Sequence, residues 1–159
     1  MNGLPRFGYL SDVAAPSESP ATLSPDGDAV NLTLDAVPEN AAVARRAVVD
    51  AAEQVGLDGE TVAKARVVVS EAFSNAAAHA YPDDSDGEVE VVAYPDPSGI
   101  TVVVRDRGEG LRPRPASDAT TERLGLLLIA ALATTTRLRH LPGGGTELRA
   151  DITAPRSWG

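Results

Sequence analysis

Hydrophobic and polar positions alternate, or recur at helical spacing, in well-separated parts of the chain. Residues 29–36 alternate apolar and polar side chains, which is the pattern of a strand with one buried face. Residues 38–54 and 58–80 instead place apolar side chains three and four positions apart, as on one side of a helix. Asp58 is suited to cap the second helix, because its carboxylate can accept free N–H groups of the first turn. This part of the chain is therefore predicted to be a strand followed by two helices.

The rest of the pattern predicts two hairpins with a helix between them. Residues 88–94 and 99–106 are strand-like runs around a turn with two prolines, and residues 135–141 and 145–152 alternate around a glycine-rich turn. Between them, residues 124–133 (LGLLLIAALA) predict a short helix that is apolar all round and hence expected to be buried. Hairpins with intervening helices indicate an α+β fold, a two-layer α/β sandwich with helices on one face of a mixed, mostly antiparallel sheet.

The length and composition predict one folded domain between two tails. A chain of 159 residues with 43% hydrophobic content suits a single core. Residues 1–28 are rich in Pro, Ser, Gly and Asp and show no hydrophobic period, so they carry too little apolar surface to offset the entropy of ordering. We therefore expect a flexible N-terminal tail at 1–28, a domain at 29–153 and a C-terminal tail at 154–159.

Charge and composition exclude several classes of function. The net charge of -9 and the pI near 4.6 disfavour a nucleic-acid or anionic membrane partner, because phosphate contacts need clustered cations. The chain contains no cysteine, which excludes disulfides and thiolate chemistry. It shows no signal-peptide pattern and no run near the roughly 18 apolar residues of a membrane span. A cytoplasmic protein is expected.

The stretch SEAFSNAAAHAY places Glu71, Asn75 and His79 four residues apart on one side of the predicted second helix. The setting is partly apolar, so an unpartnered carboxylate there would be costly and a partner is implied. The alternative is an exposed helix edge. For His79 a structural hydrogen bond competes with a catalytic role. A separate stripe is expected to face the core: Val62, Ala65, Val69, Ala72, Phe73, Ala76 and Ala80.

A second candidate group follows the strand at 99–106. In Asp106-Arg-Gly-Glu-Gly, two glycines would let the backbone approach a flat ligand, and the carboxylate can accept from an exocyclic amine such as that of adenine. An ordinary turn is the alternative. Gly125 is expected to start a helix whose free N–H groups could face phosphate, whereas the turn at 143–146 taken by itself is plain hairpin chemistry. Five arginines are either solvated or in contact with phosphate or an acidic partner: Arg105, Arg107, Arg112, Arg114 and Arg123.

These motifs in this order resemble a known family. E-x-x-x-N on a helix, D-x-G-x-G after a strand, G-L at a helix and G-T before the last strand are similar to the GHKL (histidine-kinase-like) ATPase domain of histidine kinases, Hsp90 and MutL. SEAFSNAAAHAY, VVVRDRGEG, LGLLLIAALA and GGGTEL resemble its small subgroup, the anti-sigma-factor serine/threonine kinases. The resemblance covers residues 29–153 and implies the Bergerat type of α/β sandwich.

The resemblance also implies roles for single residues, with ATP and Mg²⁺ as cofactors. Glu71 would be the general base for the attacking hydroxyl, and Asn75 would hold Mg²⁺ through its amide oxygen. Asp106 would recognise the adenine amine, and Thr146 would assist at the base through water. The nucleotide-binding residues implied are Asn75, Asp106, Gly108, Gly110, Arg123, Gly125, Leu126 and Thr146.

The implied function is transcription regulation by partner switching. The kinase would bind a sigma factor, phosphorylate a small anti-anti-sigma antagonist protein, and form a homodimer. The chain departs from the pattern at the phosphate-binding lid, where Arg123 stands in place of a glycine and could contact phosphate instead. Two alternatives therefore stay open. One is a catalytically weak or inactive protein-binding regulator of the same fold, and the other is a stand-alone ATPase or histidine-kinase catalytic domain.

Overall fold

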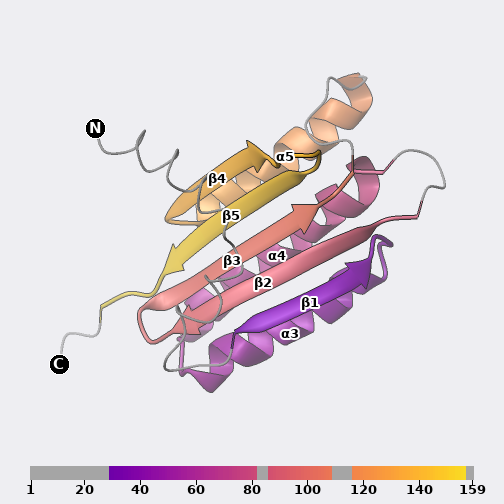
Figure 1. Ribbon diagram of the computed structural model, residues 1–159. Helices are drawn as coiled ribbons and strands as arrows, with labels where there is room; N and C mark the ends of the chain where they lie inside the picture. The colour runs from indigo at the N-terminus through magenta and orange to yellow at the C-terminus, as the bar shows by residue number, and fades with distance from the viewer. Residues whose placement is uncertain (1–28, 82–85, 109–115, 157–159) are drawn as a thin grey trace.

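A computed structural model describes residues 29–81, 86–108 and 116–156, with the backbone alone for residues 116–122. The elements follow the predicted order of a strand, two helices, a hairpin, a helix and a second hairpin (Figure 1). Their bounds are β1 (Val30–Asp35), α3 (Asn40–Gln54), α4 (Gly59–His79), β2 (Glu88–Asp96), β3 (Gly99–Asp106), α5 (Ala116–Leu132), β4 (Thr135–His140) and β5 (Thr146–Thr153).

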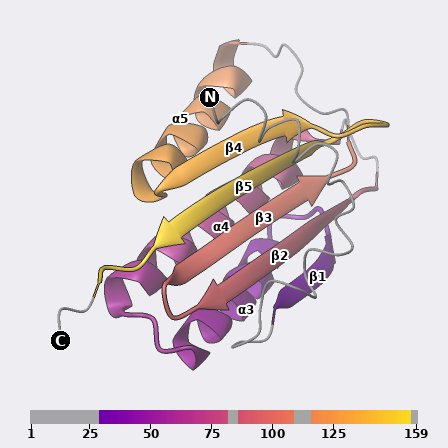
Figure 2. The same ribbon diagram turned by 60° about the vertical axis from the view of Figure 1, so that its left-hand side comes forward.

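The described strands form one sheet in the order β1-β2-β3-β5-β4, and every neighbouring pair is antiparallel. Figures 1 and 2 show the three helices on one face of this sheet, with α4 behind its centre and α5 beside β4. The predicted two-layer α+β sandwich is thus confirmed. The parallel pairing that a mixed sheet would need is absent from the strands that the structure describes.

The core lies between the sheet and α3 and α4. Alternate side chains of β2, β3 and β5, among them Val91, Val102 and Ala150, meet the helices and are fully buried. The predicted core stripe of α4 is buried along its whole length, including Phe73, whose burial stabilises the fold by roughly 2 kcal/mol. Asp58 caps α4 as predicted, because its side chain accepts from the backbone N–H groups of Glu60 and Thr61.

Two predictions about the last helix are wrong. α5 begins at Ala116, nine residues before Gly125, because residues 116–124 contain no glycine or proline and one interior glycine costs only about 1 kcal/mol relative to alanine. The helix is also not buried all round. Leu124 and Leu127 are 63% and 60% exposed, since α5 lies at the edge of the layer and packs against α4 on one side only.

Candidate active site

The C-terminal half of α4 carries the first part of the site. Glu71 and Asn75 lie one turn apart, half-buried, and both face Gly125 of α5. A Cβ atom placed on Gly125 would lie 3.0 Å from Asn75 Nδ2 and 3.1 Å from Glu71 Oε1. The structure therefore brings these three sequence-predicted residues together across two helices.

Gly125 contributes by its lack of a side chain. It is buried in the interior of α5, so its N–H belongs to the helix ladder and is not one of the free N–H groups at a helix start that the sequence predicted. Its role in this arrangement is to let α5 approach α4 closely at Glu71 and Asn75. Of its neighbours, Arg123 is exposed and Leu126 is half-buried.

The side-chain amide of Asn75 has a hydrogen-bond donor without a partner among the described residues. Its Nδ2 atom is buried, and no described group accepts from it. A buried amide without a partner is destabilising by about 1–3 kcal/mol, so native proteins seldom leave one unless a ligand or water completes it. Within the part of the chain that the structure describes, His79 on the same side is half-buried and makes no side-chain hydrogen bond, so its predicted structural bond stays a prediction.

Asp106 forms the second part of the site at the end of β3. It is buried on the helix-facing side, its Oδ1 atom accepts from the Gly108 N–H at 3.0 Å, and Thr146 of β5 lies opposite it. Gly108 in turn packs against the backbone of Ala80, just after α4, with no room for a Cβ. Asp106, Gly108 and Thr146 are thus brought together at the end of α4. Gly110, Arg112 and Arg114 lie outside the described residues.

Two residues that shape the part of the site around Asp106 were not predicted from the sequence. Gly145, with φ of 101°, lets the β4–β5 turn pack onto the backbone of Asp106 and Arg107. The Tyr81 hydroxyl donates to the Glu88 carbonyl at 2.6 Å and accepts from the Arg107 N–H at 2.9 Å, which ties the segment after Asp106 to the start of β2. The glycine run signals a turn but not what the turn packs against, and nothing in the pattern around Tyr81 signals its bonds.

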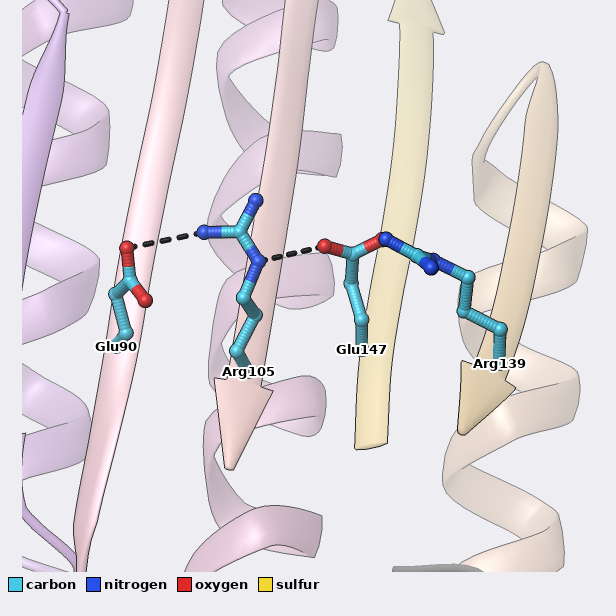
Figure 3. Close-up of polar contacts among 4 residues, drawn as sticks. All are labelled: Glu90, Arg105, Arg139 and Glu147. Atoms are coloured by element: carbon cyan, nitrogen blue, oxygen red, sulfur yellow. Dashed lines mark hydrogen bonds and ion pairs between the residues drawn. The ribbon is translucent and has the colours of Figure 1, made fainter. Parts of the chain in front are cut away.

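A row of charges crosses the opposite face of the sheet (Figure 3). Arg105 bonds Glu90 at 3.0 Å and Glu147 at 2.5 Å, and Glu147 also accepts from Arg139 at 2.9 Å. Burial would raise the pKa of Glu147, but the hydrogen bonds from the two arginines outweigh it and hold that pKa below its usual value. Arg105 therefore faces away from Asp106 and is paired with carboxylates of neighbouring strands rather than solvated.

The sequence matches a known family over most of its length. A sequence model described as "Histidine kinase-like ATPase domain" matches residues 34–152, most of the chain. The chain belongs to the histidine kinase-like ATPase domain family. In this histidine kinase-like domain, the match spans Glu71, Asn75, Asp106 and Thr146.

Named relatives of this histidine kinase-like domain agree with the family match. A Pasteuria penetrans protein named anti-sigma F factor is 33% identical over 118 residues, which cover 68% of this chain and 79% of that protein. The Oceanobacillus iheyensis serine-protein kinase RsbW is 34% identical over 82 residues, 52% of each protein. The chain spans about half the length of most of the curated relatives it matches.

A solved structure supports the fold. The crystal structure of the RsbU and RsbW domains of a Mycobacterium tuberculosis protein aligns with a TM-score of 0.60 at 24% identity, over 81% of this chain and 33% of that one. Among the described residues, no helix is long and apolar enough to cross a membrane. The same residues hold no group of three or more His, Cys, Asp or Glu side chains arranged to bind a metal ion.

Proposed function

We propose that the chain is an ATP-dependent protein serine/threonine kinase that binds a sigma factor and phosphorylates a small antagonist protein. The names of its relatives, serine-protein kinase RsbW and anti-sigma F factor, support both halves of this proposal. The observation that carries it is the meeting of Glu71 and Asn75 beneath Gly125, which sets a carboxylate and an unsatisfied amide side by side. The homodimer implied by the resemblance stays a prediction.

The residues at this end of the site fit Mg²⁺ and a triphosphate. Mg²⁺ bound with ATP takes few protein ligands and completes its shell with phosphate oxygens and waters, so a single amide oxygen from Asn75 suffices. When bound, ATP supplies the γ-phosphoryl group and Mg²⁺ neutralises its charge. Glu71 would accept the hydrogen bond of the attacking serine hydroxyl, orient it and take its proton. Arg123 and Leu126 are the candidate lid contacts.

The residues at the other end fit an adenine ring. Asp106 is a buried carboxylate beside the Gly108 N–H, and a carboxylate oxygen can accept from the exocyclic amine of adenine. Gly108 and Gly145 let Ala80 and the β4–β5 turn pack closely around Asp106, and Gly110 is expected to admit the ring. Thr146 would add a contact through water. Specificity for adenine over guanine follows, because guanine presents a carbonyl oxygen where adenine has its amine.

A non-catalytic binding module is the second candidate. α5 rests directly on Glu71 and Asn75, and Arg123 stands where the family pattern has a glycine. A phosphate that contacts Asn75 on the side of Gly125 would have to displace α5. A chain in which α5 does not shift would hold its protein partner without phosphoryl transfer.

Calorimetric titration with ATP and ADP, each with and without Mg²⁺, separates the two candidates. Kinase function predicts Mg²⁺-dependent binding in the micromolar range, about 8 kcal/mol. Asn75→Ala should lose the Mg²⁺-dependent part of the affinity, whereas Ser74→Ala, an exposed neighbour on α4, should keep it. No binding by the wild-type chain would favour the binding module, and intact Mg²⁺ dependence in Asn75→Ala would remove the metal assignment.

Transfer of labelled phosphate from ATP to a serine-containing antagonist protein tests the catalytic role. Glu71→Ala should abolish transfer while leaving nucleotide binding within about a factor of three, because a general base acts on the hydroxyl rather than on the ground-state nucleotide. Ser74→Ala again serves as the matched control. Undiminished transfer by Glu71→Ala would refute the assignment of Glu71 as base.

A further inference from the structure

Tyr81 joins three segments of the chain at the end of the sheet that carries Asp106. It lies shortly after α4, and its hydroxyl donates to the carbonyl of Glu88, the first residue of β2. The same hydroxyl accepts from the N–H of Arg107, the first residue after β3. A single oxygen atom, 2.6 Å from the carbonyl and 2.9 Å from the amide, therefore links α4, β2 and β3.

The hydroxyl of Tyr81 is held in place by its surroundings. A Cβ atom on Gly87 would overlap the tyrosine ring, so a larger residue at this position would push the ring aside. Gly87 is itself held, because its carbonyl accepts from the Ala36 N–H at 2.9 Å. The packing of the ring and the bond to the Glu88 carbonyl together fix the hydroxyl, so it offers the Arg107 N–H an acceptor at a defined position.

The bond from Arg107 acts on the first peptide beyond the sheet and not on the sheet itself. Asp106 is the last residue of β3, and its backbone is already paired with Val89 on one side and Thr146 on the other. Arg107 has no strand partner among the described residues, and it is exposed. Loss of the Tyr81 hydroxyl should therefore leave the sheet intact and loosen the segment that begins at Arg107.

The next residue carries this effect to the candidate site. Gly108 follows Arg107 directly, and its N–H donates to the Asp106 Oδ1 atom at 3.0 Å. We propose that Tyr81 is a positioning residue for the adenine end of the site. Its hydroxyl holds Arg107, which places the Gly108 N–H, which in turn orients the Asp106 carboxylate. This inference rests on the nucleotide-binding function proposed above.

Calorimetric titration of Tyr81→Phe tests the effect on the nucleotide. This variant keeps the ring and loses only the hydroxyl, so ATP and ADP should both bind about three- to tenfold more weakly, the factor expected for one hydrogen bond. The Mg²⁺-dependent part of the ATP affinity should remain, because Asn75 is held by α4 itself. Tyr94→Phe is the matched control. It removes the same atom near the other end of β2 and should bind nucleotide as the wild type does.

A double-mutant cycle separates a positioning role from a general loss of stability. In the Asp106→Ala background, Tyr81→Phe should weaken ATP binding by no more than about a further factor of two, because its effect passes through the Asp106 carboxylate. A tyrosine that only stabilised the fold would weaken binding by the same factor in both backgrounds.

Amide hydrogen exchange of the protein without nucleotide tests the physical link itself. In Tyr81→Phe the Arg107 N–H loses its acceptor and should exchange at least about tenfold faster, whereas amides in the middle of β3, such as that of Val103, should keep their rates. Gly87→Ala pushes the ring aside but keeps the hydroxyl, and it should also speed exchange of the Arg107 amide.

Three results would each overturn the role of Tyr81. They are equal ATP affinities of Tyr81→Phe and the wild type, equal factors in both backgrounds of the cycle, and an unchanged exchange rate of the Arg107 amide. A wild type that binds neither ATP nor ADP would instead refute the proposed function, and the site that Tyr81 serves would be refuted with it. The two failures therefore give different results.

Discussion

Gly108 joins the two ends of the candidate site, and its replacement by alanine has a calculable effect. A Cβ at this position would overlap the carbonyl group and the Cβ of Ala80. Overpacking typically destabilises a protein by about 1–3 kcal/mol, and we expect the upper half of that range because backbone cannot rotate away as a side chain would. For a chain of this length, a loss of about 2–3 kcal/mol lowers Tm by roughly 6–9 °C.

Urea unfolding and thermal melting of Gly108→Ala measure this loss directly. Gly59→Ala is the matched control, because a Cβ on Gly59 would meet no other part of the protein within 4 Å and Gly59 begins α4. Alanine there should leave the free energy of unfolding unchanged or raise it by up to about 1 kcal/mol. Because Gly108 also donates to Asp106, its replacement should weaken ATP binding as well. Stability of Gly108→Ala within about 0.5 kcal/mol of wild type would refute the close packing.

Three further predictions concern the charged row and the base end of the site. Glu147→Gln should lower the free energy of unfolding at pH 7 by about 1–3 kcal/mol, because Arg105 and Arg139 lose their shared carboxylate. A loss no larger than that caused by Glu39→Gln, at an exposed position, would contradict this expectation. The pKa values of Glu147 and Asp151 are lowered in the folded state, so their contribution to the free energy of unfolding should be complete above their ordinary pKa values of 4.5 and 3.8 and should fall as the pH drops below them. Urea unfolding from pH 3 to 7 should therefore show a shallower fall in the free energy of unfolding for Glu147→Gln than for the wild type. An identical fall would show that Glu147 does not contribute to the pH dependence. Asp106→Asn should weaken ATP binding with an unchanged circular dichroism spectrum, and equal affinity would sink its role in base recognition.

The sequence predicted those parts of the fold in which one period repeats over many residues. The core stripe of α4 runs from Val62 to Ala80 without interruption, so its buried face was readable. The start of α5 was not, because Gly125 resembles a boundary in sequence, whereas close packing against Asn75 is what explains a glycine there. The reason for this glycine is a neighbour that is distant in sequence, and the local pattern around Gly125 does not show it.

In the candidate site too, the sequence predicted residues that share one helix and missed contacts between different elements. Glu71 and Asn75 share one helix, so their spacing was enough to predict that they lie together. Gly145 and Asp106 are 39 residues apart in sequence and belong to different hairpins. Their close approach follows from the pairing of β3 with β5, which the sequence does not show. The side of the sheet on which Arg105 lies could not be predicted, because three consecutive valines precede it in β3 after Thr101, and such a run does not show which face of the strand is buried.

Because the valines do not show which face of a strand is buried, the row of charges on the sheet affects which strand alignment forms during folding. Valines occur at both parities of β2 and β3, and they would be nearly as well accommodated if a strand slipped by one residue. If β3 slipped, however, Arg105 would turn toward the helices and lose Glu90 and Glu147, which would leave an unpaired guanidinium group in the core. The carboxylates and guanidinium groups therefore select one alignment among those that the valines alone would accept, and the same alignment sets Thr146 opposite Asp106.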